Sequence, residues 1–66
     1  MSKDYIVERG YAEEIIKNKL TAINRAKQLA KKHNEPVAVI PCVDSIPDDS
    51  AIHYSVEPNG TVKEMR

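Results

Sequence analysis

A helix with a clear beginning and a clear end is the feature of this sequence that most constrains its fold. Asn18 is a suitable N-cap, and Asn34 followed by Pro36 predicts a C-cap and a stop. Apolar residues recur between them at helical spacing, so the helix must bury one side against the rest of the chain. The predicted buried stripe comprises Ala22, Ile23, Ala26, Leu29, Ala30 and His33.

Extended segments on both sides of this helix can supply the opposing surface. Residues 4–8 combine β-branched and aromatic residues before a turn signal at Arg9-Gly10, which predicts a strand. Residues 37–40 form a continuous apolar run typical of a central strand, whereas residues 52–57 alternate as a half-buried strand does. The tight-turn sequence at 57–61 then predicts a short return strand over 61–65.

Residues 11–18 remain open between strand and helix at this level. Helical spacing continues backward from the secure helix through Leu20 and Ile16 to Ala12, which favours one long helix. Lys19 falls within that apolar arc, which favours a helix that begins near Asn18 instead. A lysine can extend its stem over a core and reach water, so the long helix is not excluded.

Two further segments bear on the sheet. Pro41 cannot donate a backbone hydrogen bond, so it predicts a strand end, an outward-facing edge position or a bulge before Cys42-Val43. Residues 44–50 are rich in Asp, Ser and Pro, which predicts a loop between two strands.

These elements predict an α+β fold, a two-layer sandwich with one main helix on a small, mainly antiparallel sheet of three to four strands. The chain has 66 residues and no Phe or Trp, so residues 1–66 are expected to form a single domain with a thin core. Pairing with a second copy would add buried area, which favours a homodimer.

Chemical groups suited to catalysis are sparse. Cys42 is the only thiol, and neither His33 nor His53 is placed by its spacing to act as its base, so Cys42 is expected to be a buried apolar residue. No ligand spacing typical of zinc or calcium sites occurs, in the acidic loop 44–49 or elsewhere. We therefore expect no catalytic residue, no metal, no cofactor and no enzymatic activity.

Charge is unevenly distributed along the chain although its net value is zero. Residues 17–33 contain six basic residues and no acidic one. Arg25, Lys31 and Lys32 could contact phosphates, which makes nucleic-acid binding through the helix the alternative function. Basic residues near a helix C-terminus also complement the helix dipole, which is the simpler explanation.

The first functional hypothesis is a small accessory or regulatory protein that binds another protein or itself. Tyr11 and Tyr54 are the candidate interface residues if they are exposed, and the strands over 52–57 and 61–65 are the candidate sheet edges. The N-terminus lacks a signal-peptide pattern and no apolar run could span a bilayer, so a cytoplasmic protein without a membrane partner is expected. Size alone also favours a phage or mobile-element accessory protein.

Overall fold

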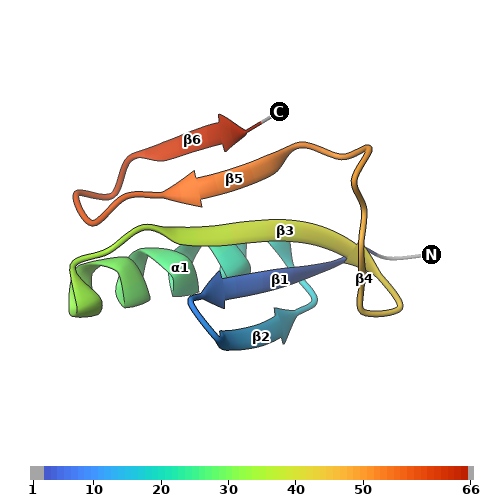
Figure 1. Cartoon of the computed structure of the whole chain (residues 1–66), viewed down its shortest axis with the longest axis horizontal. Coiled ribbons are helices and arrows are strands. Elements are labelled where there is room, and N and C mark those ends of the chain that lie inside the picture. The colour runs from blue at the N-terminus through green and yellow to red at the C-terminus, as the bar shows by residue number, and fades with distance from the viewer. Residues whose placement is uncertain (1–2, 66) are drawn as a thin grey trace.

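The computed structural model describes residues 3–65 and contains one helix packed on one antiparallel sheet (Figure 1). The expected α+β class is therefore confirmed. The elements in chain order are β1 Asp4–Arg9, β2 Ala12–Ile16, α1 Lys19–His33, β3 Val37–Val43, β4 Ile46–Pro47, β5 His53–Val56 and β6 Val62–Met65.

The sheet has the strand order β2-β1-β3-β5-β6, and the short β4 pairs with the end of β3. Every pairing is antiparallel. The prediction of three to four strands was too low, because residues 3–65 form six strands. The two additional strands come from β2, which the sequence left undecided, and from β4, which lies within the segment predicted as a loop.

The helix begins and ends where the sequence predicts. The Asn18 side chain accepts a hydrogen bond from the Thr21 backbone N–H at 3.1 Å, and Asn34 adopts a left-handed conformation with φ of 53°. The Glu35 N–H closes this C-cap by donating to the Ala30 carbonyl at 3.2 Å. Both caps satisfy backbone groups that the helix itself leaves unpaired.

Residues 12–16 form a strand, so the long-helix alternative is wrong. Gly10 has a φ of 59° and begins a two-residue turn, after which β2 returns along β1 with Arg9 opposite Ala12 and Tyr5 opposite Ile16. A positive φ at the first turn residue matches the type II′ hairpin, whose twist suits antiparallel strands. The turn chemistry at Gly10 therefore outweighs the helical spacing of the apolar residues.

The core lies between the helix and the middle of the sheet. Ala22, Ala26 and Ala30 are fully buried on the helix, while Ile23 and Leu29 are half-buried beside them. His33 is exposed, so its predicted place in the stripe is wrong, because the helix extends past the sheet at its C-terminal end. The buried strand residues in contact with the alanines are Val7, Val37, Val39 and Val56.

Pro41 lies within β3, at a position where its missing N–H costs nothing. It is opposite Tyr5 of β1 and is buried. On its other side, pairing with β5 has stopped at Val39 and pairing with β4 begins at Cys42. The Pro41 carbonyl accepts a hydrogen bond from the Asp48 N–H in this interval at 2.8 Å. The predicted strand end at Pro41 is wrong because β3 continues to Val43, and the predicted edge position is wrong because β3 lies inside the sheet.

Two other turns connect strands through residues with positive φ. Gly60 has a φ of 91° and its N–H donates to the Glu57 carbonyl at 2.9 Å, which confirms the predicted turn over 57–61. Asp44 and Ser45 have φ values of 53° and 66° and join β3 to β4 as a two-residue loop. Two successive positive φ angles define a type I′ turn, whose second position favours glycine.

Within residues 3–65, no helix is long and apolar enough to cross a membrane.

Replacing Val39 with alanine should destabilise the fold by about 2 kcal/mol, because the change removes two methyl groups from a fully buried site against the helix. Urea denaturation monitored by circular dichroism measures the change. Val62→Ala on edge strand β6 is the matched control and should cost less than about 0.5 kcal/mol, because Val62 is 38% exposed. Equal costs at the two positions would contradict the placement of the core.

Replacing Ser45 with glycine should stabilise the fold by about 0.5 to 1 kcal/mol. The left-handed conformation costs an L-residue about 1 to 2 kcal/mol, and glycine recovers most of this at some cost in chain entropy. The matched control is Ser45→Ala, which keeps the strain and should give no gain. Chemical denaturation of the wild type and the two variants measures the difference in stability. A loss of stability in the glycine variant would refute the turn geometry.

Candidate functional site

The hairpin of β1 and β2 carries the most exposed aromatic residue of residues 3–65. Tyr11 occupies the second position of the two-residue turn and is fully exposed, in accordance with its place at the tip. Ile15, further along β2, is 50% exposed. The expectation that Tyr11 is an exposed interface candidate therefore has a structural basis, whereas Ile15 was not identified from the sequence.

Strand β2 is an edge of the sheet, with β1 as its partner on one side and no described strand on the other. Residues 12–15 are exposed along its length, because the helix lies over the centre of the sheet. The second edge is β6. The predicted edge at residues 52–57 is wrong, because β5 lies between β3 and β6, whereas the predicted edge at 61–65 is confirmed.

The face of the sheet opposite the helix carries a transverse row of three isoleucines. Ile15 of β2 is opposite Ile6 of β1, and Ile6 is in turn opposite Ile40 of β3. Exposure is lowest at the central Ile6, at 5%, whereas Ile40 is half-buried and Ile15 on the edge is 50% exposed. Ile6 and Ile15 also line a hollow of about 320 Å³ with Glu13 and Ser45. We call Ile15, Ile6 and Ile40 the isoleucine row.

Two ion pairs attach the hairpin to the rest of the fold. Arg25 on the helix binds Glu14 of β2, with 3.0 Å between Nη2 and Oε2 and with Nε donating to the same carboxylate at 3.1 Å. Arg9 at the end of β1 binds Glu35 through Nη1 and Oε1 at 3.0 Å. Both pairs are partly exposed, so their main effect is to orient the hairpin rather than to stabilise the fold greatly.

Tyr54, the other candidate interface residue, lies on the opposite face of the sheet from the isoleucine row. It is opposite Val39 and packs, half-buried, against the core on the helix side. The ammonium of Lys19 lies 4.7 Å from the centre of its ring. A cation over the ring covers one side of Tyr54, so Tyr11 and Tyr54 do not form one surface.

The basic residues of the alternative hypothesis are dispersed. Arg25 is engaged by Glu14, whereas Lys31 and Lys32 are exposed in the last helical turn. Their charges lie next to the negative end of the helix dipole and are favourable there without any ligand. Phosphate binding by Arg25, Lys31 and Lys32 stays a prediction.

The structure does not bring the thiol and the two histidines together. Cys42 is fully buried near the end of β3, and this burial raises the pKa of its thiol. His33 is at the C-terminus of the helix, next to the beginning of β3, so the length of the strand separates it from Cys42. His53 binds the Asp48 backbone instead. Within residues 3–65, no group of three metal-ligating side chains forms.

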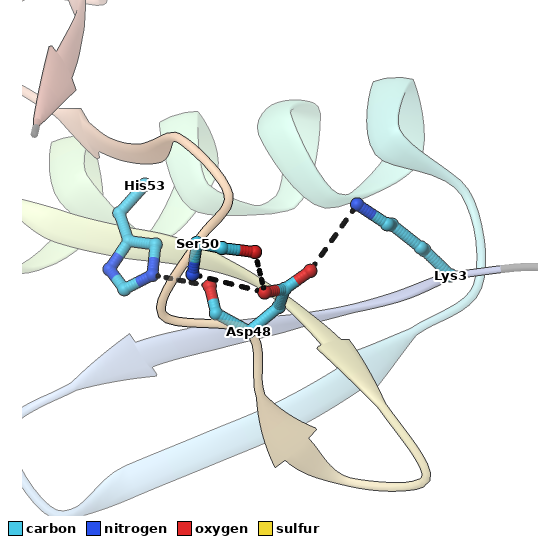
Figure 2. A network of polar contacts seen from close by, with 4 residues as sticks. All are labelled: Lys3, Asp48, Ser50 and His53. Carbon is cyan, nitrogen blue, oxygen red and sulfur yellow. Dashed lines mark hydrogen bonds and ion pairs between the residues drawn. The ribbon is translucent and has the colours of Figure 1, made fainter.

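Figure 2 shows a network of polar contacts centred on Asp48, whose backbone pairs with Pro41 near the end of β3. Oδ1 of Asp48 accepts hydrogen bonds from the Ser50 hydroxyl at 2.6 Å and from the Ser50 N–H at 3.0 Å. Lys3 Nζ lies 3.5 Å from the second carboxylate oxygen, and His53 Nε2 lies 3.1 Å from the Asp48 backbone oxygen. The serine hydroxyl is directed at the carboxylate and not at the imidazole, so this network shapes the loop before β5 rather than activating a nucleophile.

Comparison with known proteins does not add a relative. No family model, curated protein sequence or solved structure gives a significant match to the chain.

The hydrogen bonds from Ser50 lower the pKa of the Asp48 carboxyl below its ordinary value of 3.8, and Lys3 adds to this effect. A carboxyl with a lowered pKa in the folded state stabilises the fold above its unfolded pKa, and this stabilisation is lost as the pH falls through the folded value. We therefore expect the Asp48 carboxyl to titrate below 3.8 in an NMR titration. Ser50→Ala should raise the titration midpoint of the Asp48 carboxyl, whereas Ser55→Ala on β5 should leave that midpoint unchanged. An unchanged midpoint in the Ser50 variant would contradict the network.

Proposed function

We propose that this protein is a small, non-enzymatic accessory or regulatory protein that binds another protein or a second copy of itself through the β1–β2 hairpin. The observation that carries the proposal is the exposure of Tyr11 at the hairpin tip, with Ile15 half-exposed further along β2, a sheet edge that no other strand of residues 3–65 covers. We call Tyr11, Ile15 and the free edge of β2 the hairpin surface.

The chemistry of the hairpin surface suits protein recognition. Tyrosine provides a large apolar ring with a polar hydroxyl and has few side-chain rotamers to lose, which is why it is enriched at interfaces. A free strand edge offers unpaired N–H and C=O groups to an incoming strand. Both features occur here on one short element, so one partner can use them together.

The hairpin is also held in place before a partner arrives. Arg25 and Glu14 join β2 to the helix, and Arg9 and Glu35 join the end of β1 to the segment before β3. A surface that is already ordered loses less conformational entropy on binding than a mobile one. This supports the hairpin surface over the acidic loop, whose polar groups bond to one another.

A photo-crosslinking experiment tests the proposal. Replacing Tyr11 with the photoreactive residue benzoylphenylalanine keeps an aromatic ring at the tip, and irradiation of cells that express the variant should join it to a protein. A denaturing gel with mass spectrometry identifies the adduct. The same replacement at Gln28, which is exposed on the helix, is the matched control and should give no adduct above background.

Two outcomes of the cross-linking would contradict the proposal. If position 11 yields no more adduct than position 28, the hairpin surface does not bind protein. If position 28 alone yields an adduct, the helix is the binding surface and the proposal is wrong.

A further inference from the structure

We propose that the partner of the hairpin surface is a second copy of this chain, with β2 of one copy paired antiparallel to β2 of the other and Ile15 on the two-fold axis. This inference rests on the proposed function. It requires that β2 has free backbone groups on its outer side and that its charges match those of a second copy. It also requires that the other edge strand, β6, is less suited to self-pairing than β2.

Pro41 shows which residues of β2 direct their backbone N–H and C=O groups to the free edge. Pro41 lacks an N–H and directs its carbonyl away from β1, to the Asp48 N–H, so Tyr5 and Pro41 do not exchange hydrogen bonds. Tyr5 therefore directs its own N–H and C=O toward Ile16 of β2. Because this direction alternates along a strand, Glu13 and Ile15 direct their N–H and C=O groups to the free edge.

The charges of β2 are complementary to themselves in one register. A two-fold axis perpendicular to the sheet keeps both helices on the same side, so residues opposite each other share a face. With Ile15 on the axis, Glu13 of each copy is opposite Lys17 of its partner, and two opposite-charge pairs flank a central apolar pair. Both Glu13 and Lys17 are exposed, and neither takes part in a salt bridge among residues 3–65.

Other registers of β2 are less favourable. An axis at Glu13 or Glu14 places two identical carboxylates opposite each other, which is repulsive. An axis at Ile16 places the apolar Ile15 opposite the charged Lys17. The central pair would then be Ile16, which points to the helix side and already packs against the core of its own chain. In the register centred on Ile15, the exposed charges Glu13 and Lys17 and the apolar Ile15 pair therefore match. Glu14 and Ile16, which this register places opposite each other on the helix side, are already engaged by Arg25 and by the core of their own chain.

The other edge is less suited to self-pairing. An axis at Lys63 or Glu64, in the middle of β6, places like charges opposite each other. An axis at Val62 runs the ladder into the turn at Gly60, and an axis at Met65 lies at the last residue of β6, so few residues of the strand would pair. A lysine on an edge strand is also a common device against pairing, and Lys63 lies 3.5 Å from Glu57 of its own chain.

Self-pairing through β2 also extends the isoleucine row. Ile15 of each copy would lie beside the other, so that the rows of two sheets join into one of six isoleucines across the helix-free face. This covers Ile15, the most exposed residue of the row. Because β2 has only five residues, the interface is small and the dimer is expected to be weak.

A charge-reversal experiment on the full chain tests the register. Wild-type protein should sediment with twice the monomer mass of 7.4 kDa as its concentration approaches about 1 mM. Glu13→Lys or Lys17→Glu alone should raise the dissociation constant at least about tenfold, because two attractive pairs become repulsive. The double variant E13K/K17E restores opposite charges and should recover wild-type affinity.

Matched changes on the other edge serve as the control, because Lys63→Glu and Glu64→Lys should leave the dissociation constant unchanged. If a single variant fails to fold by circular dichroism, contacts between Glu13 and Lys17 of differently isotope-labelled wild-type copies, measured by NMR, decide instead. A strict monomer at about 1 mM overturns self-pairing but not the proposed function, which fails only in the cross-linking at position 11. A dimer insensitive to Glu13 and Lys17, or assemblies larger than a dimer, also overturn the proposal.

Discussion

The close packing of three alanines against a layer of valines is the contact on which the rest of the structure depends. Ala22, Ala26 and Ala30 recur every four residues and form a ridge without side chains beyond Cβ, so the helix can lie close to the sheet. The core lacks Phe and Trp, and this short distance lets small residues fill it. A larger residue at any of the three positions would lift the helix away from Val39 and its neighbours.

This packing also explains why one side of the sheet is available for binding. Within residues 3–65, one 15-residue helix covers the middle of one face of the sheet and leaves the isoleucine row on the opposite face uncovered by a helix. The edge strands β2 and β6 each pair with one described strand. The hairpin of β3 and β4 approaches part of that face, since Ser45 shares a hollow with Ile6 and Ile15. The edge at β2 stays free, and its backbone and charges then determine what can pair with it.

Part of the candidate site could be predicted from the sequence, and the rest could not for identifiable reasons. Tyr11 follows Gly10 directly, and a turn there already predicts an exposed ring. Tyr54 alternates correctly in its strand, but only the register shows that it faces the helix rather than the isoleucine row. Ile15 was missed because its segment fits both helical and extended patterns, and exposure depends on which of these forms.

Local chemistry along the chain determined the caps at Asn18 and Asn34, the turn at Gly60 and the apolar run of β3, because each depends on neighbours within a few residues. Only the tertiary structure decided that β2 is a strand at the edge, that β5 is internal and that Pro41 lies at a gap between two partners. Strand order and register are set by contacts between residues distant in sequence, and a single sequence contains no local signal for them.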